Sequence, residues 1–334
     1  MIAATRPFMD SAEVISWTRL IVLFWALGIA AWLDHKERRV PNEFWITWVK
    51  PAIFLWVLDL LNSEAEWYIF ATAAGIVAYA SVAVIGRPTF NDIFSGSRLD
   101  IAVSLWYLVG IAGIVQGLLL HSDESLLSVI SGDASDTATL WWSTFAVLIP
   151  IFLVDMAWRM RLIHGGADCK GLMWVAILVP SWSSLPIMYP ETMESAVIAM
   201  PPAIALLVWG GLAFLALPII MVLKNLKNGN TTLKLIWHAE RMQIDKVMSS
   251  HVWLLSSIAE MPSGEKKIIH RTRAPRRTPT KEKLAKEIEI LKENGVEEVW
   301  ITRKYPLLVF LWPAIIPLFL VGGPMAYIMP LLGL

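Results

Sequence analysis

Two aspartates lie at comparable positions in the chain, each beside one end of a long apolar run. Asp34 follows the run from Val14 to Leu33, and Asp168 precedes the run from Gly171 to Tyr189. Two carboxylates about 3 Å apart can share one proton, because like charges that close cannot both ionise. One carboxylate then acts as a base on water, while its protonated partner donates to a carbonyl oxygen and stabilises the developing oxyanion. Such a pair can hydrolyse a peptide bond without a metal or other cofactor.

Small and polar residues flank the two aspartates, and five of them are candidates for supporting the site: Pro41, Asn42, Gly165, Gly166 and Lys170. Without side chains, Gly165 and Gly166 would let an extended substrate approach Asp168 closely and would allow a tight turn before the next helix. Asn42 is expected to cap the second apolar helix. Lys170 could lower a carboxylate pKa by its proximity, or it could extend toward lipid headgroups as interfacial lysines do.

Each aspartate also has a simpler structural interpretation. Asp34 could be an interfacial carboxylate neutralised by Lys36 or Arg38, because charges normally gather at the ends of membrane spans. Asp168 could cap the helix that begins beside it. The Pro-Asn pair that follows Asp34 and the two glycines that precede Asp168 favour the catalytic interpretation.

Other charged residues compete for the second catalytic role. Asp100 begins an apolar run and is more simply a helix cap, but it is the reserve candidate for the second carboxylate. Asp155 has Arg159 four residues further on and is more simply half of a salt bridge. Lys50 is unusual because it lies inside an apolar run, and no role is assigned to it. His164 could position a substrate carbonyl.

The composition is that of a protein embedded in lipid. Of the 334 residues, 56% are hydrophobic and 17% are charged, whereas soluble domains carry roughly 25% charged residues. Eight runs are long enough to cross a hydrocarbon core of about 30 Å. These runs are Val14 to Leu33, Phe44 to Leu61, Trp67 to Ile85, Ile101 to Leu120, Leu140 to Trp158, Gly171 to Tyr189, Ala203 to Leu223 and Leu307 to Leu334.

Prolines interrupt two of the eight runs. Pro180 and Pro186 fall in the sixth run, and Pro313 and Pro317 are among four prolines in the eighth. Because proline removes an intrahelical hydrogen bond, these two segments are expected to be kinked or partly re-entrant. The predicted fold class is an all-α polytopic membrane protein of about eight transmembrane helices, with a small cytoplasmic region before the last span.

Basic residues are concentrated in alternate loops. Segments 34–43, 87–99, 159–170 and 224–305 hold 25 of the 28 Lys and Arg residues. The intervening loops instead carry acidic residues: Glu64, Glu66, Asp123, Glu124, Asp133, Asp136, Glu191 and Glu194. Basic residues close to span ends are retained in the cytoplasm. We therefore expect both termini to lie outside the cell membrane, and both Asp34 and Asp168, which four spans separate, to lie at its cytoplasmic face.

Three parts are expected along the chain. Residues 1–223 would form a transmembrane domain of about seven spans, 224–305 a basic cytoplasmic region, and 306–334 the last transmembrane segment. In the basic region, Thr278-Pro279 can start a helix whose apolar stripe is Leu284, Ile288 and Leu291, and which Asn294-Gly295 would end.

Two more segments of the basic region can be interpreted. Val296 to Ile301 is expected to form a short strand. Leu233 to Ile258 mixes apolar and basic residues, as amphipathic helices on anionic headgroups do. Membrane lipids are therefore expected partners, whereas the region lacks the motifs of nucleic-acid binding. The single cysteine, Cys169, excludes a disulfide framework within one chain.

Around the two aspartates the sequence resembles the archaeal preflagellin and prepilin peptidases, relatives of the bacterial type IV prepilin peptidases among the GxGD aspartic proteases. Asp34 with Arg39-Val40-Pro41-Asn42 is similar to the motif of the family's first aspartate. Gly165-Gly166-Ala167-Asp168-Cys169-Lys170 is similar to its Gly-Gly-Ala-Asp-x-Lys motif. The stretches Leu172 to Pro180 and Trp300 to Pro306 resemble longer archaeal members that have an added C-terminal domain.

The resemblance implies that Asp34 and Asp168 are the catalytic dyad. It also implies the substrates, which are archaellin or type IV pilin-like precursors with a short basic leader before an apolar helix. The shortest family members place two spans between the aspartates, whereas this sequence has four. A cation-coupled transporter is an alternative, because intramembrane charges and proline-broken helices also describe ion pathways. A non-catalytic protein of pilus or archaellum assembly is a third hypothesis.

Overall fold

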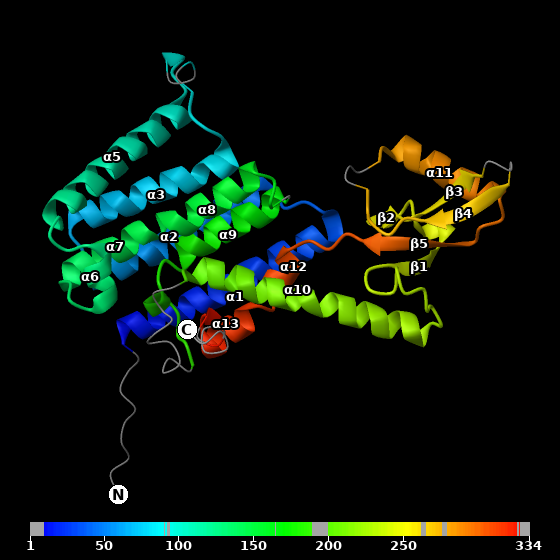
Figure 1. The fold of residues 1–334 in the computed structure, drawn as a ribbon. Coiled ribbons are helices and arrows are strands. Elements are labelled where there is room, and N and C mark those ends of the chain that lie inside the picture. The colour runs from blue at the N-terminus through cyan, green and yellow to red at the C-terminus, as the bar shows by residue number, and fades with distance from the viewer. Residues whose placement is uncertain are drawn as a thin grey trace, which may run out of the picture. The chain divides into compact units, whose positions relative to one another are not determined.

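The computed structural model describes residues 10–89, 91, 94–163, 165–188, 200–261, 265–275, 279–325 and 327. The chain is mostly helical (Figure 1) and divides into two compact units. The first unit consists of Met1–Gly211 and Pro306–Leu334, and the second of Leu212–Tyr305. The division between residues 211 and 212 falls inside the helix α10 (Pro202–Lys227), whereas the sequence suggested a boundary at residue 223, near the end of that helix.

Among the described residues, six helical stretches are long and apolar enough to cross a membrane. They are α1 (Ser11–Glu37), α2 (Asn42–Asn62), α3 (Trp67–Ile85), α5 (Arg98–Leu120), the consecutive helices α7 (Asp136–Ala146) and α8 (Leu148–Arg159), and α10. Each coincides with one of the eight apolar runs found in the sequence. The molecule therefore has the helices of a multi-pass membrane protein.

The remaining two runs do not form one continuous long helix in the part of the chain that is described. The sixth run begins in α9 (Gly166–Leu178), and the 3₁₀ turn η1 (Trp182–Ser184) follows it after Pro180. The eighth run contains α12 (Leu308–Leu311) and α13 (Ile315–Val321), with Pro313 between them. The breaks expected near Pro180 and Pro313 are confirmed, since proline cannot supply a backbone donor, whereas Pro317 lies inside α13. The count of eight spans is not confirmed.

Glycines allow α3 and α5 to pack closely side by side (Figure 1). A β-carbon on Gly110 would lie 2.3 Å from the Cα of Gly75, and one on Gly113 would lie 2.6 Å from the backbone nitrogen of Thr72. In lipid, helices associate through close van der Waals packing, which small residues permit. The two backbones therefore touch where the glycines lie.

The centre of the first unit is α9. Its residues from Gly171 to Leu178 are all buried, and the helix contacts α1, α2, α3, α8 and α12. A helix that is apolar on every side belongs in an interior. The apolar character of this short helix therefore reflects contact with other helices more than contact with lipid.

A partly buried ion pair joins α1 to α2. The guanidinium of Arg19, which is fully buried, lies 3.0 Å from a carboxylate oxygen of Asp59 and donates to the backbone oxygen of Leu55 at 3.0 Å. A charge within an apolar helix is costly unless it has such partners. The pair fixes how α1 and α2 align.

The second unit contains strands. An antiparallel three-stranded sheet has the order β1 (Glu240–Gln243), β5 (Glu298–Arg303) and β2 (Val252–Leu254). A separate hairpin pairs β3 (Ser256–Glu260) with β4 (Lys266–His270). The helix α11 (Lys281–Glu293) buries Ile288 and Leu291 in an apolar core with Val299 and Ile301 of β5.

The sequence predictions for this unit had mixed outcomes. The helix with its apolar stripe is confirmed as α11, which Thr280 caps, while Thr278 lies outside the described residues. The short strand is confirmed as β5. The amphipathic helix suggested for Leu233 to Ile258 is wrong, because this segment forms turns, β1, the 3₁₀ helix η3 (Ile244–Lys246), β2 and most of β3. Val252 and Leu254 are buried on either side of the half-buried Trp253, which is the two-residue period of a strand.

Candidate active site

Asp34 lies in the last turn of α1 and is only 8% exposed. Arg38 follows the helix with a left-handed φ of 57°, and its backbone N–H donates to the backbone oxygen of Asp34 at 3.1 Å. Such a residue is a common way to end a helix. Lys36 lies over the ring of Trp32, 4.8 Å from the ring centroid. Among the described residues neither Lys36 nor Arg38 forms a direct ion pair with Asp34, but the positive charge of Arg38 does act on this carboxylate, as the simpler interpretation expects.

Asp168 is in the first turn of α9 and is 9% exposed. One carboxylate oxygen, Oδ1, accepts a hydrogen bond of 3.3 Å from the backbone N–H of Leu308, at the start of α12. The N-cap of α9 is Gly165, and no side chain caps this helix. Asp168 is therefore not a helix cap, and its carboxylate is instead bound to a segment 140 residues later in the sequence.

Asp34 acts electrostatically on Asp168, and an open cavity lies beside Asp34. Burial and the neighbouring negative charge of Asp34 raise the pKa of Asp168, which lies outside the six candidate spans, to about 7, against the opposing effect of the Leu308 N–H. In addition, an open cavity of about 410 Å³ lies between the ends of α1, α2 and α9. Its polar lining includes Asp34, Arg38, Asn42, Gly165, Gly166 and Lys170. We refer to it as the polar cavity.

Of the two glycines before Asp168, Gly165 is required because it leaves room for the Asp168 carboxylate. A β-carbon on Gly165 would lie 2.0 Å from Oδ2 of Asp168, so only glycine leaves room for the carboxylate in this position. A β-carbon on Gly166 would meet only the ring of Trp158, at 3.5 Å, which is an ordinary contact. Neither glycine has a positive φ, so neither adopts a backbone conformation that requires glycine.

Asn42 has a different role from the one predicted. The N-cap of α2 is Pro41, and Asn42 is the first helical residue. The side chain of Asn42 donates to the backbone oxygen of Val84 at 3.0 Å and accepts from Nζ of Lys170 at 2.7 Å. The prediction of an Asn42 cap is wrong, because its amide links the end of α3 to α9. Lys170 is half-buried, and it bonds to Asn42 in addition to lining the polar cavity.

The competing acids are engaged elsewhere. Ser97, and not Asp100, caps α5: its hydroxyl accepts from the backbone N–H of Asp100 and donates to the Asp100 carboxylate. The predicted pair of Asp155 and Arg159 is confirmed at 2.8 Å, and the Tyr79 hydroxyl also donates to Asp155 at 3.0 Å.

Two further candidates have no place in the site as described. Lys50 is exposed on α2 and forms no ion pair with another described residue. His164 lies outside the described residues. In the part of the chain that the structure describes, no group of three or more His, Cys, Asp and Glu side chains is arranged to hold a metal ion.

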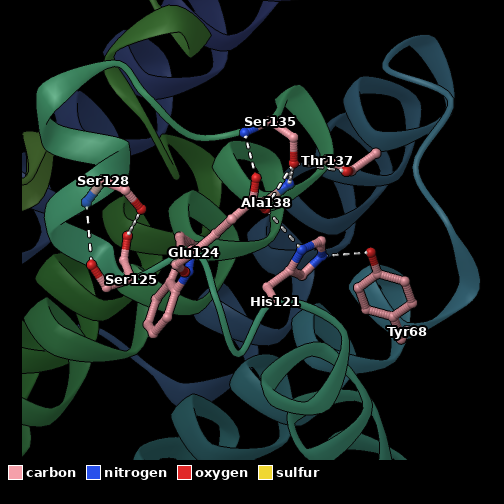
Figure 2. Close-up of polar contacts among 9 residues, drawn as sticks. Tyr68, His121, Glu124, Ser125, Ser128, Ser135, Thr137 and Ala138 are labelled. Carbon is pink, nitrogen blue, oxygen red and sulfur yellow. Dashed lines mark hydrogen bonds and ion pairs between the residues drawn. The ribbon is translucent and has the colours of Figure 1, made fainter.

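A second polar cluster, which the sequence did not reveal, lies at the other end of α3 (Figure 2). His121 follows α5 and is 8% exposed, with Nε2 2.9 Å from the Tyr68 hydroxyl and Nδ1 3.4 Å from a carboxylate oxygen of Glu124. Glu124 in turn accepts from the backbone N–H and the hydroxyl of Ser135, at 2.9 and 2.8 Å. These two bonds hold the pKa of Glu124 below its usual range.

The contacts of this His121 cluster indicate a structural role and not a catalytic one. The Ser135 hydroxyl donates to Glu124 and not to His121, so it is not arranged as a serine activated by a neighbouring base (Figure 2). The ring of His121 also stacks on Trp141 of α7, with centroids 5.9 Å apart. The cluster therefore fastens α3, α5 and α7 to one another. The only sign of this cluster in the sequence was His121 itself, which precedes a loop with acidic residues.

Comparison with known proteins gives no relative: no protein-family model, curated protein or solved structure matches this chain.

Proposed function

We propose that this chain is a membrane-embedded aspartic endopeptidase in which Asp34 and Asp168 form the catalytic pair. The observation that carries the proposal is the meeting of these two buried carboxylates, from helices that four candidate spans separate in sequence, close enough for one charge to shift the pKa of the other. An open polar cavity is lined by Asp34 and by Gly165 and Gly166, which precede Asp168 in the sequence. The other two acids considered for the role have partners within or between helices.

The chemistry follows from the two environments. Asp168, with a pKa of about 7, holds a proton near neutral pH and donates it to the oxygen of the scissile carbonyl. Asp34 acts as the base that takes a proton from water, and the water oxygen bonds to the carbonyl carbon. When the tetrahedral intermediate collapses, the carbon–nitrogen bond breaks and a proton passes from Asp34 to the leaving amine. One hydroxyl of the intermediate returns a proton to Asp168, so the carbonyl re-forms and both carboxyl groups regain their starting states. The Leu308 N–H keeps the Asp168 carboxyl oriented throughout.

The substrates we propose are archaellin or type IV pilin-like precursors that carry a short basic leader. Support comes from the motifs around the two aspartates and from the alternation of basic and acidic loops. That alternation favours an active site at the cytoplasmic face, with both termini outside, and about eight spans once α9 and α12–α13 are counted with their following residues. Residues 224–305 would then lie beside anionic lipid headgroups, which attract their excess of basic residues.

Cleavage of a precursor tests the proposal directly. A tagged archaellin or type IV pilin-like precursor is co-expressed with the protein, and loss of the leader is read as a shift in gel mobility. Asp34→Asn and Asp168→Asn should each abolish the shift while the protein still accumulates in the membrane, because the shared-proton pair is lost with little change in volume. Asp100→Asn, whose carboxylate bonds within α5, is the matched control and should cleave normally.

Turnover that survives in either Asp34→Asn or Asp168→Asn would contradict the assigned pair. A failure of the unaltered protein to shorten any such precursor would contradict the proposed function itself.

A further inference from the structure

An apolar groove of about 230 Å³ runs along α9, between α2 and α3. Its walls include Lys170, Met173, Trp174 and Ile177 of α9 with Val49 and Ile53 of α2. The α9 residues are spaced i, i+3, i+4 and i+7, so they form one face of the helix. From Lys170 to Ile177 that face extends roughly 10 Å, or about two helical turns. The third wall, on α3, includes the small residues Ala80, Ser81 and Ala83.

This groove adjoins the polar cavity at Lys170. Lys170 lines both, and its bond to Asn42 marks the junction between them. Two other apolar grooves are described, one around Gly75 and Phe152 and one around Phe24 and Trp312. Neither shares a residue with the polar cavity. Of these three, only the groove along α9 leads away from Asp34 along an apolar surface.

We propose that the groove along α9 receives the first two turns of the substrate's apolar helix, with the cleavage site at its Lys170 end. This inference rests on the proposed function. An apolar helix placed in a groove presents side chains at i, i+3 or i+4, and i+7, which is the spacing of the α9 wall. The small side chains of α3 allow another helix to come close, which matters in lipid, where packing drives association.

The size of the groove also favours side chains of a helix over a separate small molecule. At about 230 Å³ it is smaller than the roughly 300 to 1,000 Å³ of small-molecule pockets. The walls hold their shape through a hydrogen bond of 2.8 Å from Nε1 of Trp174 to the backbone oxygen of Trp48. A substrate helix seated here leaves the preceding extended residues beside Asp34 and Asp168.

Disulfide trapping tests the inference with neighbouring positions on α2. Ile53 lines the groove, whereas Phe54 is 61% exposed and does not. Ile53→Cys and Phe54→Cys are each paired with single cysteines along the first apolar helix of an archaellin or type IV pilin-like precursor. The native Cys169 stays in place because it is fully buried. We expect several-fold more cross-linked product at Ile53→Cys, limited to precursor positions that recur every three or four residues.

Filling the groove is an independent measurement. Ala83→Trp, which projects into the groove from α3, should lower kcat/KM for the precursor about tenfold by weakening substrate binding. Val82→Trp is the matched control, because Val82 neighbours Ala83 on the same helix but does not line the groove. Its kcat/KM should stay near that of the unaltered protein.

The outcomes separate this inference from the proposed function. Normal cleavage with equal cross-linking at Ile53→Cys and Phe54→Cys would overturn the docking site and leave the peptidase intact. Cross-linking confined to Ile53→Cys without any cleavage would support docking and overturn the peptidase. Disulfide-linked dimers of Ile53→Cys that form without precursor, and that precursor does not displace, would show that a second copy occupies the groove and would overturn the inference.

Discussion

At the scale of single residues, three neighbours of the Asp168 carboxylate determine its position and its protonation. The missing side chain of Gly165 leaves room for Oδ2, the N–H of Leu308 binds Oδ1, and the charge of Asp34 acts on the carboxylate as a whole. Burial and Asp34 favour the protonated carboxyl, whereas the Leu308 N–H favours the ionised one. The balance gives a group that can hold or release a proton near neutral pH.

That balance predicts how stability depends on pH. The pKa of Asp168 is about 7 in the fold, against about 3.9 for an aspartate in an unfolded chain. Since the folded state holds this proton more tightly, the contribution of Asp168 to the free energy of unfolding is fully present below about pH 4 and is lost as the pH rises to about 7. Asp168→Asn should therefore raise the melting temperature in detergent, by an amount that grows across this range and then stays constant.

Thermal unfolding of the purified protein at several pH values gives this measurement. Asp123→Asn is the matched control, because Asp123 is exposed in the loop after α5. A melting-temperature difference for Asp168→Asn that does not vary between pH 4 and pH 8 would contradict the raised pKa.

A second prediction concerns Gly165. In Gly165→Ala the new methyl group would occupy the position of Oδ2, so the Asp168 carboxylate must rotate away. A flexible side chain moves at small cost to folding, but a displacement of about 1 Å at a catalytic group can lower the rate about 100-fold. We expect such a loss in the cleavage assay with little change in melting temperature. Gly166→Ala, where space is free, should remain close to full activity; equal losses in both variants would mean that Gly165 has no special role.

At the scale of helices and strands, the contact between α3 and α5 depends on the absence of side chains. Gly110→Ala would place a β-carbon 2.3 Å from the Cα of Gly75, in a backbone that cannot move aside easily. Overpacking of this kind costs about 1 to 3 kcal/mol. The melting temperature in detergent should fall accordingly. Gly211→Ala in α10 is the control, because no neighbouring atom lies within 4 Å of its added β-carbon. An unchanged melting temperature in Gly110→Ala would contradict the close contact between α3 and α5.

Helices and strands could be predicted from the sequence where nearby residues alone determine where they begin and end. The predicted span from Trp67 to Ile85 matches α3 residue for residue, because an unbroken apolar run lies between Glu66 and Gly86. The break near Pro180 follows from the chemistry of proline. The segment from Leu233 to Ile258 was misjudged, since strands as short as β2 give too few alternations to be told from a helix.

The candidate site was predictable only in part, because its contacts cross long distances in sequence. The motifs drew attention to Asp34 and Asp168 as a possible pair. The bond from Lys170 to Asn42 spans 128 residues and the one from Leu308 to Asp168 spans 140, so no local pattern could reveal either. The spatial requirement for Gly165 depends on the rotamer of a neighbouring side chain, which spacing alone does not specify.

At the scale of the whole molecule, the mechanism requires both aspartates on one side of the membrane. Four candidate spans separate them, an even number, as this requirement demands. We predict that a cysteine at Ser131 reacts with an impermeant thiol reagent added to intact cells, and that a cysteine at Ser249 reacts only after permeabilisation. Unaltered Cys169 is buried and serves as the unlabelled control. Labelling of Ser249→Cys in intact cells would contradict a cytoplasmic active site.

The hydrogen bond between Leu308 and Asp168 has a consequence for the order of events during synthesis. A ribosome adds residues from the N-terminus, so both aspartates enter the membrane well before the Leu308 N–H exists. The whole unit from Leu212 to Tyr305 must be translated in between. A nascent chain therefore carries both acids but lacks the donor that orients one of them. In the proposed mechanism, the oriented form of the Asp168 carboxyl would therefore arise only after synthesis has passed Leu308.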